Sequence, residues 1–105
     1  MNNKIINLLG LATRARNIVS GDNAVENALK LNKVKMLIIS EEASDKTKKN
    51  YKFYANKYNI PIIYIGSIEE LSNAIGENNR AIIGIKDINI AKGIEKIIDG
   101  GEAIG

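Results

Sequence analysis

The spacing of apolar side chains divides the chain into segments with two different periods. Between residues 3 and 15 they recur three or four positions apart, which predicts an amphipathic helix. Residues 34–40 form a nearly continuous apolar run bounded by polar residues, the pattern of a central strand covered on both faces. A similar run at 61–66 predicts a second buried strand, with a proline tolerated at its start.

Turn and cap residues indicate where the second helix begins and ends. A short strand is predicted at residues 17–20, and Gly21 ends it. Asp22 is then a good N-cap for a helix whose buried face begins with Val25. Asn32 is expected to end that helix in the left-handed conformation.

The rest of the chain continues the alternation of helix and strand. We predict a third helix from Ser44 or Asp45 to about Tyr58, a fourth capped by Ser67 and closed by Gly76, a strand over residues 80–86, and a last helix ending at Gly100 and Gly101. This order predicts an α/β protein, a three-layer αβα sandwich around a small mixed sheet of about four strands. We expect residues 1–105 to form a single domain, with residues 100–105 as a frayed tail.

The predicted third helix carries many lysines and a stripe of aromatic residues. The lysines could form a nucleic-acid patch, but a solvated outer face is the better interpretation. The stripe, with helical spacing, is interpreted as core rather than as a platform for stacked bases. The lysines are Lys46, Lys48, Lys49, Lys52 and Lys57, and the stripe is Tyr51, Tyr54, Ala55 and Tyr58.

Composition narrows the classes of function. The chain has no cysteine and no histidine, which excludes disulfides, zinc fingers and Ser–His or Cys–His catalysis in these residues. The formal net charge of +3 mildly favours polyanionic partners. No apolar stretch approaches the roughly 20 residues of a membrane span, and the first residues lack the pattern of a signal peptide. We therefore expect a cytoplasmic protein that makes no contact with a membrane.

An enzymatic function finds little support. Neither of the glycine-rich phosphate-binding motifs, G-x-G-x-x-G or G-x-x-x-x-G-K-[ST], is present. Glu69 and Glu70 are adjacent on a helix and point in different directions, so they make a poor acid/base pair. Glu41 and Glu42 lie at a strand end without a partner base or a metal-ligating set, so a solvated loop is the better interpretation. We predict no catalytic residues, no metal and no cofactor.

The turn at Ser20 and Gly21 indicates an RNA-binding surface. A helix N-terminus offers free N–H groups and a positive dipole end, both of which suit phosphate. Asparagines on the helix after the turn can read base edges, and arginines can contact phosphates. Arg14 and Arg16 precede the turn, and the loop over residues 76–80 ends at Arg80. We predict that these positions converge on one surface.

Several short motifs occur in an order and spacing that are specific when taken together. They are LGLATRAR at residues 9–16, Ser20–Gly21, LIISEEAS at 37–44, Ile60–Pro61, and LSNAIG at 71–76 followed by Arg80. Through them residues 4–99 resemble the kink-turn-binding ribosomal protein family of the archaeal and eukaryotic L-seven-Ae type, and within it the small bacterial YlxQ-like branch. The resemblance implies an αβα sandwich that binds RNA kink-turns, which are sharp bends built on tandem sheared G·A pairs.

In that family a motif of the form G-x-N-E-x-x-K at the start of the second helix contacts the G·A pairs. Gly21 and Asn23 match it, whereas Ala24 stands at the glutamate position and Asn27 at the lysine position. Each lost base contact is worth about 1–3 kcal/mol. The chain could therefore bind a kink-turn weakly, bind another RNA bend, or rely on backbone and shape contacts. The resemblance also implies that the loop at residues 75–79 helps clasp the bend.

We thus predict a non-catalytic, monomeric RNA-binding protein that recognises a kink-turn or similarly bent RNA and is associated with the ribosome or with structured untranslated RNA. The alternative is a protein-interaction module of the translation or transcription machinery that has lost kink-turn specificity. The predicted RNA-binding residues are Arg14, Arg16, Asn17, Ser20, Gly21, Asp22, Asn23, Asn27, Lys30, Ile75, Gly76, Glu77, Asn78 and Arg80.

Overall fold

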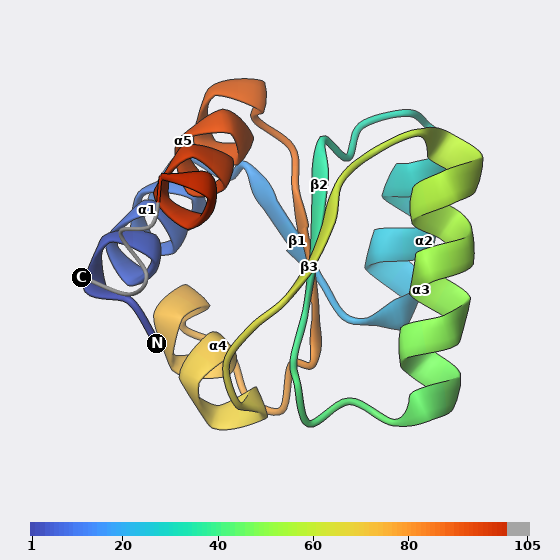
Figure 1. Ribbon diagram of the computed structural model, residues 1–105, viewed down its shortest axis with the longest axis horizontal. Helices are drawn as coiled ribbons and strands as arrows, with labels where there is room; N and C mark the ends of the chain where they lie inside the picture. Colours follow the sequence, from blue (N-terminus) through green and yellow to red (C-terminus); the bar gives the residue numbers. More distant parts are fainter. Residues whose placement is uncertain (101–105) are drawn as a thin grey trace.

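Helices and strands alternate along residues 1–100, the part of the chain that the computed structural model describes (Figure 1). This order agrees with the one predicted from the sequence. The predicted tail falls outside the description except for Gly100. The elements are α1 (Asn3–Arg14), β1 (Ile18–Ser20), α2 (Asp22–Lys30), β2 (Met36–Ile39), α3 (Asp45–Tyr58), β3 (Ile62–Tyr64), α4 (Ile68–Ile75), β4 (Ile82–Ile85) and α5 (Ile88–Asp99).

The four strands form one mixed sheet in the order β1-β4-β2-β3. Strand β4 pairs antiparallel with both β1 and β2, whereas β2 and β3 are parallel. Strands β1, β2 and β3 therefore point in one direction and β4 in the other. As a result, the carboxyl ends of β1, β2 and β3 and the amino end of β4 lie at the same end of the sheet. We call this end the carboxyl edge; it is distinct from the two sides of the sheet, where β1 and β3 are the edge strands.

Helices cover both faces of the sheet, which confirms the predicted three-layer sandwich (Figure 1). Helices α1, α4 and α5 pack on one face around Leu9, Ile38 and Leu71. Helices α2 and α3 pack on the other face around Leu37 and Tyr51. Every side chain of β2 is buried, because this strand is internal to the sheet and both of its faces are covered. The prediction of a central strand over residues 34–40 is thus confirmed.

The prediction for residues 61–66 was wrong in one respect. Strand β3 lies at the edge of the sheet, and its side chains are only half-buried. A continuous apolar run is compatible with either position, because periodicity reports the two faces of a strand and not whether a neighbour pairs with each side of it. The proline at position 61 agrees with an edge position.

The expectations for α3 hold for its buried side. Tyr51 and Ala55 are in the core, whereas Tyr54 and Tyr58 are half-buried at the boundary with α2. The lysines lie on the solvent side, although Lys48 is half-buried and its Nζ donates to the backbone oxygen of Glu41 at 2.7 Å. Ser44 is the N-cap of this helix, accepting from the backbone N–H of Thr47.

Candidate nucleic-acid interface

Four chain segments meet at the carboxyl edge, and backbone hydrogen bonds join them. The N–H of Gly21 donates to the carbonyl of Ile82 at 3.0 Å, which links the β1–α2 turn to the start of β4. Ser40, at the end of β2, donates its N–H to the carbonyl of Ala81 and its hydroxyl to the carbonyl of Gly66. The edge is therefore a connected structure rather than a set of independent loops.

Gly21 is the point at which the chain turns from β1 into α2. Its φ of 85° and ψ of 157° lie in a region that essentially only glycine adopts. A Cβ at this position would lie 3.5 Å from Nη1 of Arg80, so the bare backbone of Gly21 and the guanidinium are close neighbours. The structure thus brings together two residues that are far apart in the sequence and were both predicted to bind RNA.

Helix α2 begins at this turn without a side-chain cap. Asp22 was predicted to be its N-cap, and this is corrected by the structure: Gly21 occupies the cap position and Asp22 is the first helical residue. The other four described helices all have capping side chains, from Asn2, Ser44, Ser67 and Asp87. Within residues 1–100, no side chain therefore caps the first N–H groups of α2, and the Arg80 guanidinium lies next to Gly21, where the helix begins.

The carboxylate of Asp22 is engaged elsewhere. It accepts a hydrogen bond from the hydroxyl of Tyr51 at 2.7 Å, and one turn later Glu26 accepts from Tyr54 at 3.1 Å. Burial, followed by the bond to Asp22, raises the pKa of Tyr51 far above its ordinary value. The bond to Glu26 raises the pKa of Tyr54. These two bonds fasten α2 to α3 and engage both carboxylates of α2 with tyrosine hydroxyls of α3.

The buried hydroxyl of Ser72 in α4 holds the end of the loop between α4 and β4. Oγ of Ser72 accepts from the backbone N–H of Arg80 at 2.7 Å and donates to the carbonyl of Ile68 at 2.6 Å. Gly76 and Asn79 take left-handed backbone conformations that shape the loop. The Arg80 side chain pairs with Glu77 at 3.4 Å, and its buried Nε has no hydrogen-bond partner among residues 1–100. Its guanidinium is thus held next to Gly21.

The outward face of α2 continues the surface from Gly21. Asn23, Asn27 and Lys30 are all exposed on it, and so is Ala24. Helical spacing places the two asparagines one turn apart, with Lys30 a further turn along. Asn23 is adjacent to the open N-terminus, which gives an amide next to free backbone donors.

Four predicted residues do not contribute to this surface. Ile75 is only 3% exposed and lies in the core between the sheet and helices α1, α4 and α5, so the prediction that it binds RNA was wrong.

The other three lie away from the surface. The carbonyl of Asn17 accepts from the N–H of Lys86, beyond the carboxyl end of β4, whereas Gly21 bonds to the first residue of β4. Asn17 and Gly21 are therefore at opposite ends of β1. The side chain of Asn17 donates to Asp87 at 3.5 Å, and Arg14 and Arg16 precede it at the same end. The structure does not bring Arg14, Arg16 or Asn17 together with Gly21 and Arg80.

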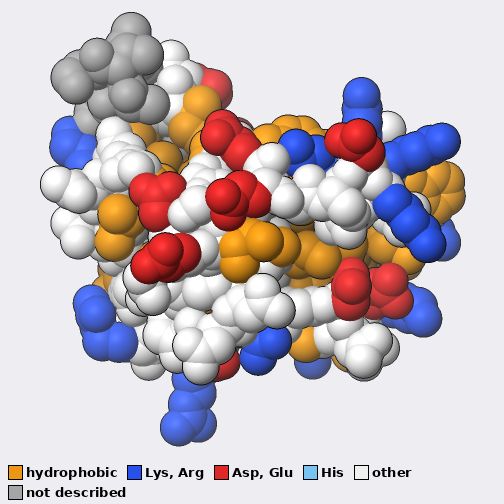
Figure 2. Space-filling view, turned by 90° about the horizontal axis from the view of Figure 1, so that it is seen from below, with side chains coloured by type: hydrophobic (Ala, Val, Ile, Leu, Met, Phe, Trp, Pro, Cys, Tyr) orange, Lys and Arg blue, Asp and Glu red, His pale blue; other side chains and the backbone are white. Residues whose placement is uncertain are grey.

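Acidic side chains are spread across the carboxyl edge, and basic ones gather to one side (Figure 2). Several of the carboxylates have structural partners. Glu42 accepts from the N–H of Ile68 at the start of α4, and Glu70 accepts from the N–H of Ser67 and from the amino group of Met1. These hydrogen bonds lower the pKa of Glu70. Glu42 and Glu70, one residue from each glutamate pair, thus join neighbouring segments of the chain.

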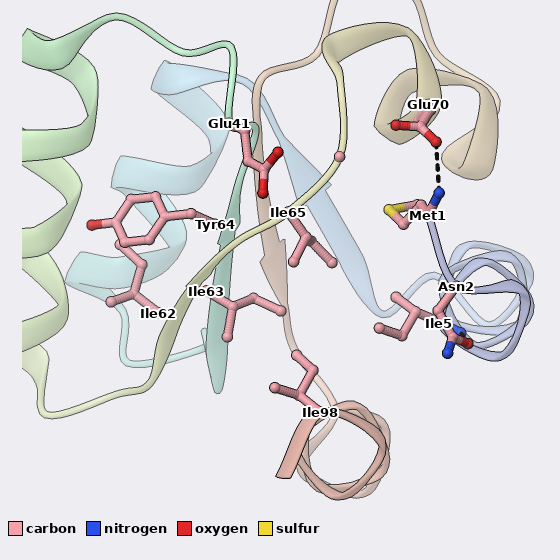
Figure 3. Close-up of a pocket in the computed structure, with 11 residues that line it drawn as sticks. Met1, Asn2, Ile5, Glu41, Ile62, Ile63, Tyr64, Ile65, Glu70 and Ile98 are labelled. Atoms are coloured by element: carbon pink, nitrogen blue, oxygen red, sulfur yellow. Dashed lines mark hydrogen bonds and ion pairs between the residues drawn. The ribbon is translucent and has the colours of Figure 1, made fainter. Parts of the chain in front are cut away.

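A cavity of about 590 Å³ opens between β3 and the N-terminus (Figure 3). Isoleucines form much of its wall, and the salt bridge from Met1 to Glu70 spans 2.8 Å at its rim.

Among the described residues, no cluster of acidic side chains is suited to hold a metal ion. None of the described helices is long and apolar enough to cross a membrane.

Comparison with known proteins agrees with this architecture. A profile of the "Ribosomal protein L7Ae/L30e/S12e/Gadd45 family" matches residues 3–94. The chain belongs to this family. Two proteins named "RNA-binding protein YlxQ" are each 32% identical to it, one from Enterococcus faecium over 92% of this chain and 93% of its own length, and one from Bacillus subtilis (strain 168) over 88% and 92%.

Two solved structures share this fold. One described as a protein with unknown function from Bacillus halodurans C superposes with a TM-score of 0.88 at 35% identity, covering 93% of this chain and 99% of that one. A Giardia lamblia 15.5kD RNA binding protein superposes with a TM-score of 0.76 over 98% of this chain and 88% of its own. At 19% identity, the second likeness bears on the fold alone.

Sequence reasoning missed the residues that hold the carboxyl edge in place. Ser72 lies within the motif LSNAIG, yet a serine inside a helix carries no sign that its hydroxyl will reach a loop eight residues on. Tyr51 and Tyr54 were recognised as packing residues, but their hydroxyls also bind the two carboxylates of α2. The four-residue separation of Asp22 and Glu26, matched by aromatic residues in the next helix, is a signal that could have indicated these bonds.

Proposed function

We propose that the chain is a non-catalytic protein that binds bent, structured RNA of the kink-turn type through the carboxyl edge. The observation that carries this proposal is the juxtaposition of the uncapped N-terminus of α2, the bare backbone of Gly21 and the guanidinium of Arg80. Backbone donors, a positive helix end and an arginine suit a phosphate backbone, and the absence of a side chain at Gly21 permits its close approach.

Asn23 is our candidate for the contact to bases. It is exposed next to the helix N-terminus, and its amide can both donate and accept. Family membership and the names of the two relatives support RNA as the ligand. Because Ala24 and Asn27 replace two polar groups of the family motif, we expect recognition to depend more on backbone, Arg80 and RNA shape than in proteins that have both.

The test is a titration of the purified protein with a kink-turn RNA, followed by fluorescence anisotropy at two salt concentrations. The matched RNA has its tandem G·A pairs changed to Watson–Crick pairs. We expect binding to the first RNA to be lost with the second. Equal and steeply salt-dependent binding to both would mean contact driven by phosphates without recognition of the bend, and would refute kink-turn specificity.

Two variants locate the site. Asn23→Ala should weaken binding by roughly five- to 150-fold, since a good base contact is worth about 1–3 kcal/mol. Arg80→Gln should also weaken binding, and it should make the salt dependence of log K shallower by about 0.7–0.9, since it removes one phosphate contact. Arg16→Gln is the control, because it removes one positive charge at the opposite end of β1. A loss with Arg16→Gln as large as that with Arg80→Gln would contradict our placement of the site.

The cellular setting is part of the proposal. We propose a cytoplasmic monomer that associates with the ribosome, in keeping with the ribosomal proteins for which the family is named. Sedimentation of the protein with ribosomal subunits, before and after nuclease treatment, tests this. Release by nuclease is the expected result. Association with a protein partner that survives nuclease and high salt would instead favour an interaction module.

A further inference from the structure

The positive charge of the molecule is concentrated on α3. Five lysines and Asp45 give this helix a formal charge of +4, whereas the whole chain carries +3, so the residues outside α3 sum to −1. Figure 2 shows the same imbalance, with basic side chains gathered on the side where α2 and α3 lie and acidic ones across the middle. The electrostatic attraction for a polyanion is therefore centred beside the carboxyl edge and not on it.

The outward face of α3 also carries an exposed aromatic ring. Phe53 is 62% exposed, although a phenylalanine is among the costliest side chains to leave in water. Lys49 and Lys57 lie one turn before and one turn after it, and Lys46 lies a turn before Lys49. Among residues 1–100, none of these three lysines forms an ion pair. Phe53 contacts the ring of Tyr54 with centroids 6.0 Å apart, and Nζ of Lys57 lies 5.5 Å from the Tyr58 ring, yet most of the Phe53 side chain stays open to solvent. We call this exposed ring and its three lysines the Phe53 stripe.

The Phe53 stripe is continuous with the candidate RNA interface. Helix α3 starts at the carboxyl edge, a few residues after Ser40. The N–H of Ser40 donates to the carbonyl of Ala81, next to the start of β4. The bonds from Tyr51 and Tyr54 fasten it against α2. Lys30 of α2 and Tyr54 of α3 line one small hollow at the seam between the two helices. An RNA strand leaving the N-terminus of α2 can thus pass across the joined helices α2 and α3.

We infer that the Phe53 stripe binds a single-stranded segment that flanks the folded RNA held at the carboxyl edge. Lysines spaced along a helix suit successive phosphates, and an exposed ring stacks on an unpaired base of any identity. A duplex offers no free base face to Phe53, which is why a single strand is the favoured occupant. This inference rests on the proposed function, because it requires RNA to be bound at the edge.

The experiment compares one kink-turn RNA with the same RNA extended by about ten unpaired nucleotides, at the 5′ end in one probe and at the 3′ end in another. Four proteins are titrated by fluorescence anisotropy: wild type, Phe53→Ala, Lys49→Gln with Lys57→Gln, and Lys92→Gln with Lys96→Gln. The last pair is the control, because these lysines are exposed on α5, on the other face of the sheet, and the same charge is removed. Circular dichroism establishes that each variant is folded.

We expect one extension to tighten wild-type binding at least about fivefold, as stacking of one base predicts. Phe53→Ala and the Lys49/Lys57 variant should lose this gain and bind the unextended RNA like the wild type, while the α5 control keeps it. For the Lys49/Lys57 variant, the salt dependence of log K should also be shallower by about 1.4, at about 0.7 for each phosphate contact.

The possible failures are distinguishable. Equal wild-type binding to extended and unextended RNA would overturn the single-strand inference and leave the proposed function intact. An equal loss with the α5 control would overturn it too, because charge in general would then be responsible. If the wild type binds neither RNA, the proposed function fails and this inference fails with it.

Discussion

Replacing Ser72 by alanine removes the one side chain that ties α4 to the backbone of Arg80. Its hydroxyl accepts from the N–H of Arg80 at 2.7 Å and donates to the carbonyl of Ile68 at 2.6 Å, and the residue is only 3% exposed. After the substitution the N–H of the half-buried Arg80 loses this acceptor, at a position where the buried residue 72 shields it from water. The substitution therefore removes a hydrogen bond and leaves the backbone N–H of Arg80 without its acceptor.

The magnitude follows from these contacts. A buried donor left without a partner costs about 1–3 kcal/mol. Alanine is a better helix former than serine, which offsets roughly 0.5 kcal/mol. We therefore expect Ser72→Ala to lower the free energy of unfolding by about 0.5–2.5 kcal/mol. Each kcal/mol corresponds to about 4–8 °C in Tm for a domain near this size.

Urea denaturation followed by circular dichroism measures this change. The midpoint should fall while the slope m stays constant, because the surface exposed on unfolding is the same. Asn73→Ala is the matched control: the neighbouring side chain is exposed, so its loss should change stability by less than about 0.5 kcal/mol. A Ser72→Ala effect as small as that of the control would refute the role we assign to the hydroxyl.

Two further predictions concern the packing around β4 and the link between α2 and α3. A Cβ at Gly84 would lie 2.9 Å from Cγ2 of Val19, so Gly84→Ala should destabilise the protein by about 1–3 kcal/mol in urea denaturation, and adding Val19→Ala should recover part of this; no recovery would contradict the clash. The raised pKa of Tyr51 means that its stabilising effect is complete below the ordinary tyrosine pKa of about 10 and declines as pH rises above it. The stability difference between wild type and Tyr51→Phe should therefore shrink from about pH 9 to pH 11, and a constant difference would show that ionisation of Tyr51 is not involved.

The fold was predictable because each element carries its own signal. The buried run of β2 and the caps at Ser44, Ser67 and Gly76 are local features, and their order is enough to favour an αβα sandwich. Whether a strand is internal depends on partners elsewhere in the chain. The half-buried edge position of β3 could not be obtained from its own residues for this reason.

The candidate site was predictable only in part. Gly21, Asn23 and Arg80 were identified by chemistry and by resemblance, and Gly21 and Arg80 lie together. Arg14 and Arg16 were grouped with them because they are close in sequence, but β1 is extended and carries the chain across the sheet between the two positions. The N-cap of α2 is Gly21 and not the predicted Asp22. The Asp22 carboxylate instead accepts from Tyr51 of α3, a contact that the residues around Asp22 in the sequence do not reveal.

The strand order also has a consequence for folding during synthesis. Strand β1 is completed within the first 20 residues, yet among the described residues it pairs only with β4, at residues 82–85. A chain emerging from the ribosome can therefore form α1, α2, and the pair of β2 and β3 before β1 has any partner. Closing β4 between β1 and β2 is a late, long-range step, of the kind that slows folding. The same step brings Arg80 to Gly21, so the capacity to bind RNA should arise only once nearly the whole domain has left the exit tunnel.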